Sequence, residues 1–226
     1  MAANISRQDF SHIRKHAETF LRRTRQPTAN GRPGAPQSSI PQNPALISHR
    51  PKTGRRIEPI ILLSPSASSL LRISNIKSFL EGGIYTDADA ASGSNILHIS
   101  RLLPSLDPQR PFRFILVDTP DQFKPDYWSR VVAVFTTGQQ WQFKSYKWQN
   151  PPELFSHALG IYVGWRGEQV PQTVRSWGRG VMTTEIDKYH PAQGLRGRIR
   201  DREVVEAIWT TIEERMRSSG EWGSGR

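Results

Sequence analysis

Two continuous apolar stretches, residues 112–117 and 131–135, each end in polar, turn-forming residues. Runs of this kind predict strands that are buried on both faces, as in a mostly parallel sheet covered by helices. In such sheets ligands collect beyond the carboxyl ends of the strands. The residues that follow these two strands are Asp118, Thr119, Asp121, Thr136, Thr137, Gln139 and Gln140. A nucleotide-binding type of fold is therefore the first hypothesis.

Strand and helix patterns alternate after residue 57. Further strands are predicted at 57–63, 96–99, 161–165 and 182–186. Ser66 or Ser68 is suited to cap a helix that runs to Leu80, and Asp201 is suited to cap a last helix with an apolar face. The alternation predicts an α/β fold, a three-layer sandwich with a mostly parallel central sheet.

The loop after the first strand is where a phosphate-binding loop would lie. A P-loop needs glycines, whose amides converge on phosphate, and a lysine. This chain has the sequence SPSAS at 64–68, without glycine or lysine, and Pro65 removes one amide donor. The helix that follows could attract an anion weakly, but ordinary capping is the favoured interpretation.

Composition narrows the class of protein. The chain of 226 residues has no cysteine, which excludes disulfides and thiolate sites and suits an intracellular protein. No apolar run approaches the roughly 20 residues that span a bilayer, and no secretory signal precedes the first strand, so we expect a soluble protein.

The net charge of +11 is concentrated at the start of the chain. Residues 1–57 carry eleven Lys and Arg against two acids, whereas residues 58–226 carry twenty basic and eighteen acidic residues. Six of the seventeen prolines fall between residues 27 and 51, a composition typical of disorder. We therefore predict a basic, largely disordered linker at 1–56 with a short amphipathic helix near 7–25. A folded domain follows at 57–218, with a flexible tail at 219–226.

Three segments of the predicted domain carry a family resemblance. RRIEPIILLSPSASSLLRISNIKSFLEGG, PFRFILVDTPDQFKPDYWSRVVAVFTTGQQWQFKSYKW and PPELFSHALGIYVGW occur in this order between about residues 55 and 216. They resemble the C-terminal domain of the parafibromin family, a subunit of the RNA polymerase II-associated factor complex. The resemblance implies a Ras-like fold, with the topology of P-loop GTPases but without GTP binding or hydrolysis.

The resemblance also implies a function. Family members are longer, with an N-terminal half that holds the other subunits of the complex, so this chain is expected to be a fragment. It implies a non-enzymatic nuclear domain that helps attach the complex to elongating polymerase and chromatin and supports histone modification during transcription. The implied partners are the other subunits and the phosphorylated tails of the polymerase or its elongation factor. No cofactor is implied.

Two basic and aromatic clusters are candidate partner-binding sites. Cations beside aromatic rings can hold a phosphate and stack a proline or tyrosine of an extended peptide. Trp141 and Phe143 are expected to pack in the core, whereas Trp148 is the expected exposed anchor. The candidate residues are Gln139, Gln140, Lys144, Tyr146, Lys147 and Trp148 in the first cluster, and Arg175, Trp177 and Arg179 in the second.

Catalytic and metal-binding interpretations are weaker. Asp118 and Asp121 follow a strand, but no phosphate loop or activated nucleophile accompanies them, so we interpret them as turn formers. His12 and His16 lie one helical turn apart without a further ligand nearby. The sequence predicts no enzyme, no metal and no cofactor.

Two alternatives remain open. The basic segment 1–56 could make the chain a nucleic-acid-binding module, with an affinity that falls steeply with salt. Less favoured is a degenerate NTPase with an unusual phosphate loop.

Overall fold

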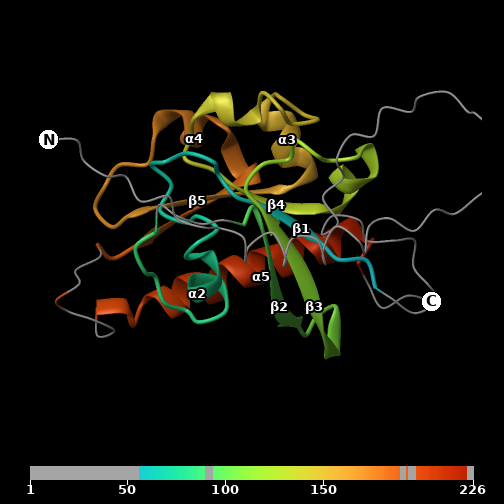
Figure 1. The fold of residues 1–226 in the computed structure, drawn as a ribbon, viewed down its shortest axis with the longest axis horizontal. Coiled ribbons are helices and arrows are strands. Elements are labelled where there is room, and N and C mark those ends of the chain that lie inside the picture. Colours follow the sequence, from blue (N-terminus) through green and yellow to red (C-terminus); the bar gives the residue numbers. More distant parts are fainter. Residues whose placement is uncertain (1–55, 90–93, 189–191, 193–196, 223–226) are drawn as a thin grey trace, which may run out of the picture. The chain divides into compact units, whose positions relative to one another are not determined.

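The computed structural model describes residues 56–89, 94–188, 192 and 197–222. Apart from Arg56, the predicted linker lies outside these residues, as do the helix near 7–25, His12 and His16. The elements, shown in Figure 1, are β1 (Ile60–Leu62), α2 (Ile76–Leu80), β2 (Ile96–Leu103), β3 (Asp107–Val117), η2 (Pro125–Arg130), β4 (Val131–Phe135), η3 (Gln140–Phe143), α3 (Pro151–His157), β5 (Leu159–Trp165), α4 (Gln172–Ser176), η4 (Gly178–Gly180), β6 (Val181–Ile186) and α5 (Asp201–Ser219).

The six strands form one sheet in the order β2-β3-β1-β4-β5-β6. The strand β2 runs antiparallel to β3, and all the other neighbours are parallel. The predicted α/β class and mostly parallel sheet are therefore confirmed. Because β3 and β4 both run parallel to β1 and lie on either side of it, the loops that follow these three strands lie at the same end of the sheet.

The sheet separates two hydrophobic cores. In β1 and just after it, Ile61 and Leu63 belong to one core, while Ile60 and Leu62 belong to the other, and all four are fully buried. Successive side chains of a strand point to opposite faces, so an unbroken apolar run feeds both cores. In Figure 1, α2 and α5 lie on one side of the sheet, and α3 and α4 lie on the other.

The long helix α5 closes the first core. Its predicted apolar face is confirmed, with Val205, Ile208, Trp209, Ile212 and Met216 at most 2% exposed. The indole nitrogen of Trp209 donates a hydrogen bond of 3.0 Å to the carbonyl of Leu80, which ties α5 to the end of α2. Among the described residues, neither α5 nor any shorter helix is suited by length and hydropathy to cross a membrane.

The helix predicted to begin at Ser66 or Ser68 is shorter than expected, since α2 begins only at Ile76. Asn75 explains the delay. Its side-chain oxygen accepts from the amide of Arg72 at 2.8 Å, and its nitrogen donates to the carbonyls of Leu70 and Thr86. A buried carboxamide that bonds the neighbouring backbone competes with helical hydrogen bonding, and so it holds residues 70–75 in turns.

The predicted cap at Asp201 is also wrong. Asp201 is the first residue of α5, and no side-chain capping bond is present at this end. Its buried carboxylate instead accepts hydrogen bonds from the Tyr85 amide and from Arg198. The first strand is likewise shorter than predicted, with Ile57 57% exposed.

Candidate partner-binding surfaces

The loop after β1 uses its own serines to satisfy its backbone. The Ser66 hydroxyl accepts from the Ser68 amide at 3.3 Å, and the Ser64 hydroxyl accepts from the Ser66 amide at 3.4 Å. Ser66 also donates to the side-chain oxygen of Gln139 at 3.1 Å. Two amides that would have to face a phosphate in a nucleotide site are therefore turned toward serine oxygens. This geometry agrees with the missing P-loop motif.

A groove of about 530 Å³ opens at the amino end of β4. Its walls come from η2, from the segment between η3 and α3, from the end of α3 and from the end of α5. We call it the Trp148 groove. The residues that define it are Trp128, Lys147, Trp148, His157, Arg215 and Trp222.

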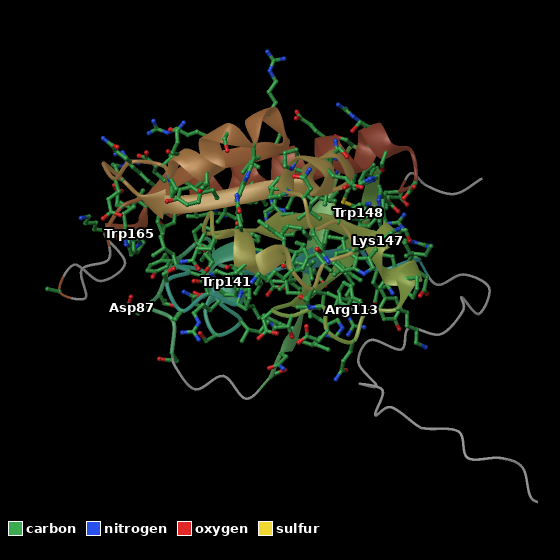
Figure 2. The ribbon with its side chains drawn as sticks, turned by 90° about the horizontal axis from the view of Figure 1, so that it is seen from above. Asp87, Arg113, Trp141, Lys147, Trp148 and Trp165 are labelled. Atoms are coloured by element: carbon green, nitrogen blue, oxygen red, sulfur yellow. The ribbon has the colours of Figure 1, made fainter. Side chains whose placement is uncertain are left out.

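Trp148 is half-buried and held by three neighbouring side chains. Its ring stacks on His157 with centroids 4.0 Å apart and planes 15° apart, and it meets Trp128 edge-on at 5.9 Å. The ammonium of Lys147 lies 4.5 Å from the Trp148 ring centroid. A cation this close to an indole face is attracted by its π electrons. Figure 2 shows Lys147 and Trp148 beside each other at one end of the domain.

The groove combines cations with aromatic walls. The Arg215 guanidinium donates to the carbonyl of Ser156, which holds it against the end of α3. Within the part of the chain that the structure describes, neither Lys147 nor Arg215 forms an ion pair with a carboxylate. Asp126 and Glu221 also line the groove. Such a groove is suited to a peptide that presents an anionic group beside an apolar or aromatic side chain.

A chain of packed aromatic rings connects the two predicted clusters. It runs from Trp177 to Phe143, Tyr146, Trp128 and Trp148 in steps of 5.5–5.9 Å. Tyr146 and Trp177 are only 3% and 8% exposed, so they support the surface from below. Burial raises the pKa of the Tyr146 hydroxyl to about 12, although a hydrogen bond with the Gln142 side chain opposes this shift.

The other predicted site residues do not all gather in the groove. Lys144, Arg175 and Arg179 are exposed around η3, α4 and η4. Gln139 and Gln140 are exposed at the carboxyl end of β4, where Gln139 also accepts from the Trp141 indole at 2.7 Å. Only Lys147 and Trp148 of the nine candidates line the groove.

The expectations for the tryptophans are met only in part. Phe143 is fully buried, as predicted, but Trp141 is 47% exposed and does not belong to either core. The η3 turn explains the difference, because it directs Gln142 and Phe143 inward and leaves Trp141 outside. The predicted anchor Trp148 is half-buried rather than freely exposed.

Four residues that line the groove were not predicted from the sequence: Trp128, His157, Arg215 and Trp222. They come from η2, from α3, from α5 and from the segment just after α5, up to 74 positions from Trp148 in the numbering. Arg215 stood in the last turn of a predicted helix, where a cation is already explained by the helix dipole. No local signal connected these residues, because the tertiary fold brings them together.

Of the two acidic residues after β3 that were predicted to form turns, Asp121 lies in one, whereas the amide of Asp118 donates to the carbonyl of Asn95. The amide of Phe123 donates to the carbonyl of Pro120 at 2.8 Å, which places Asp121 inside the turn. Burial raises the pKa of Asp118, although hydrogen bonds from its own amide and from Thr119 oppose this. Among the described residues, no group of three or more His, Asp or Glu side chains is placed to hold a metal ion.

Comparison with known proteins identifies the family of this chain. Residues 55–215 match the family described as "RNA pol II accessory factor, Cdc73 family, C-terminal". The chain belongs to the Cdc73 family. This confirms the resemblance carried by the three sequence segments, and it places the protein among the RNA polymerase II accessory factors of transcription.

Curated Cdc73 relatives extend the match. The chain is 40% identical over 184 residues to cell division control protein 73 of Schizosaccharomyces pombe, which covers 78% of this chain and 47% of that protein. It is 39% identical over 170 residues to the Saccharomyces cerevisiae protein of the same name, with 74% and 40% covered. The chain thus spans less than half the length of these Cdc73 relatives.

A solved Cdc73 structure has the same fold. The conserved domain of yeast Cdc73 matches with a TM-score of 0.65 and 40% sequence identity, over 73% of this chain and 99% of that one. The Trp148 groove lies within the residues matched by the Cdc73 family, except for its last few residues at the end of α5 and beyond.

Proposed function

We propose that this chain contains a non-catalytic interaction domain of a transcription elongation subunit. The domain helps attach the RNA polymerase II-associated factor complex to elongating polymerase and chromatin in the nucleus, and it thereby supports co-transcriptional histone modification. The domain spans about residues 57–218 and works together with the other subunits of that complex. Membership of the Cdc73 family supports this role.

The single observation that carries the proposal at the level of residues is the Trp148 groove. Its cations Lys147 and Arg215 border a rigid indole that rests on His157 and Trp128. A phosphate gains charge-assisted hydrogen bonds from such cations, and a neighbouring proline or tyrosine gains contact with the ring. We therefore propose phosphorylated tails of the polymerase, or of its elongation factor, as the ligands of this groove.

We also propose that the domain is Ras-like and has no NTPase activity. The strand order with a single antiparallel strand at one edge supports the first part. The serine bonds within residues 64–68 support the second, because they occupy amides that a nucleotide phosphate would need. A degenerate NTPase is therefore the weaker alternative.

Calorimetric titration of the full chain with phosphorylated and unphosphorylated tail peptides tests the proposal, with magnesium-GTP as a further ligand. We expect selective binding of a phosphopeptide and no heat from GTP. Trp148→Ala should weaken phosphopeptide binding by at least about tenfold, as expected for a central aromatic anchor. Trp141→Ala is the matched control, because Trp141 is exposed and does not line the groove.

Loss of the half-buried Trp148 ring could also disturb the fold, so Lys147→Ala provides a second variant at an exposed position. It should weaken phosphopeptide binding while leaving the thermal unfolding midpoint unchanged. Equal affinity of the wild type, Trp148→Ala and Lys147→Ala would contradict the assignment of the groove, and GTP heat would contradict the non-catalytic proposal.

A further inference from the structure

Two short helical segments on the outer layer lie side by side. At one end, the Thr173 hydroxyl of α4 donates to the carbonyl of Gly138, just before η3, at 3.0 Å. At the other end, the rings of Phe143 and Trp177 lie 5.6 Å apart. The earlier residues of the two segments contact each other, and so do the later residues. Residues 140–144 therefore run beside residues 173–177 in the same direction.

Three exposed cations lie along this pair of segments. Lys144 directly follows η3, while Arg175 and Arg179 lie in α4 and η4. None of the three forms an ion pair with a carboxylate among the described residues. Glu153 is the only acidic residue within 138–158 and 171–181. These two stretches therefore carry a net positive charge, although the folded part of the chain is nearly neutral.

The same pair of segments also carries an exposed indole, on η3. Trp141 is 47% exposed, and its ring nitrogen donates to Gln139, which is itself held by Ser66. In a 3₁₀-helix, side chains three residues apart eclipse, so Trp141 and Lys144 lie on the same side of η3. Figure 2 shows Trp141 well apart from Lys147 and Trp148, so this surface is distinct from the groove.

We infer that Trp141, Lys144, Arg175 and Arg179 form a binding site for single-stranded nucleic acid, which we call the η3–α4 patch. An exposed aromatic ring stacks on an unpaired base of any sequence, and cations beside it contact the backbone phosphates. The cations are spread along two segments instead of converging on one point. A row of this kind matches the repeated charge of a phosphate backbone better than the single phosphate of a peptide.

The buried rings below make the patch rigid. Phe143, Phe155 and Trp177 pack against one another with centroids 5.4–5.8 Å apart. Gly138 has a positive φ of 88°, and a Cβ at this position would lie 2.9 Å from Val174, so the two segments meet at their closest approach there. The patch thus presents its cations from a fixed platform.

Fluorescence anisotropy of a labelled 15-nucleotide oligouridine, titrated with the full chain between 50 and 200 mM salt, tests the inference. The basic segment 1–57 is also expected to attract nucleic acid, so variants are compared with the wild-type chain under the same conditions. Trp141→Ala should weaken binding by at least about fivefold, as expected for loss of one stacked base. The triple variant Lys144→Ala, Arg175→Ala, Arg179→Ala should make the plot of log affinity against log salt less steep, by about 2 in slope. Each phosphate contact of a single strand contributes roughly 0.7 to the steepness, and three contacts are lost.

A matched control removes two exposed cations elsewhere. Arg166→Ala with Lys188→Ala takes away side chains that pair with Asp187 and Glu168, and we expect affinity close to that of the wild type. A duplex oligonucleotide provides a second control, because its bases are already stacked and Trp141→Ala should not change its affinity.

Unchanged oligouridine binding in both Trp141→Ala and the triple variant would overturn the inference and assign all binding to the basic segment. If the triple variant instead loses phosphopeptide binding while its oligouridine affinity is unchanged, the patch is part of the peptide site and the inference is equally overturned. Circular dichroism melting identifies any variant that has failed to fold. Because every altered side chain is exposed, we expect the wild-type melting temperature.

Discussion

Removing the carboxylate of Asp201 should cost a large part of the stability of the domain. Asp201 and Arg198 are 1% and 3% exposed and form a paired contact, with Nη2 to Oδ1 at 2.5 Å and Nε to Oδ2 at 2.7 Å. The Tyr85 amide donates to the same carboxylate at 2.7 Å, and Arg198 also donates to the carbonyl of Asp187. The pair therefore joins the start of α5 to the loop after α2 and to the end of β6.

The structure sets the size of the effect. Asp201→Ala leaves the Arg198 guanidinium buried without its counter-charge, and breaking a buried pair in this way costs about 3–5 kcal/mol. That is a large fraction of the roughly 5–15 kcal/mol by which a domain is usually stable. Replacing both partners, as in Arg198→Met with Asp201→Leu, removes both charges and should cost less than Asp201→Ala alone. The remaining cost is then mainly the hydrogen bond that the Tyr85 amide loses, about 1–3 kcal/mol.

Urea unfolding of the full chain, followed by tryptophan fluorescence, measures these free energies. Arg166→Ala is the control, because it breaks an ion pair with Asp187 whose side chains are 45% and 34% exposed. Such a surface pair contributes at most about 1 kcal/mol. The reasoning would be refuted if Asp201→Ala lowered the free energy of unfolding by no more than the control does. It would also be refuted if the double variant lost as much stability as the single variants Arg198→Met and Asp201→Leu lose together.

Three further outcomes follow from packing and from titration. Gly138→Ala should destabilise the domain by about 1–3 kcal/mol in urea unfolding, because its φ of 88° disfavours a side chain and the new Cβ would press on Val174. Phe143→Ala should cost about 3–5 kcal/mol and Trp141→Ala much less, because Phe143 is fully buried and Trp141 is 47% exposed; similar unfolding midpoints for the two variants would count against the assigned core. Burial raises the pKa of Asp118, so its charged form costs stability above that pKa, and the cost disappears as the pH falls through it. Asp118→Asn should therefore raise the melting temperature slightly at pH 7 and lose this advantage in acid, and a constant difference across pH would contradict the sign.

Much of the fold was readable from hydrophobic patterning. The run at 131–135 became β4 with the predicted bounds, and the apolar face of α5 was assigned residue by residue. Both depend on local regularity, which a sequence displays directly. The helix before Leu80 was overestimated because the side-chain bonds of Asn75, which hold the turns, reach backbone that only the tertiary structure brings near.

The candidate site was predictable only in part. Lys147 and Trp148 are adjacent in sequence and were found from their chemistry, but Arg215 and Trp222 enter the groove from the far end of the chain. Trp141 was placed in the core because tryptophan is usually buried, and sequence cannot show which side of a 3₁₀ turn faces outward. The nine predicted residues were treated as two clusters along the chain. In the structure, Lys147 lines the groove, whereas the exposed cations Lys144, Arg175 and Arg179 lie on the separate η3–α4 patch.

The central claim is that Lys147 in the Trp148 groove recognises a phosphate. The most direct measurement is a double-mutant cycle by calorimetry, with wild-type and Lys147→Ala chains each titrated with one tail peptide in its phosphorylated and unphosphorylated forms. The account predicts that phosphorylation strengthens binding to the wild type, and that Lys147→Ala loses much of this gain, with a coupling of about 1.5–3 kcal/mol as for a charged hydrogen bond. A coupling near zero, with the full effect of the phosphate retained in Lys147→Ala, would contradict the claim.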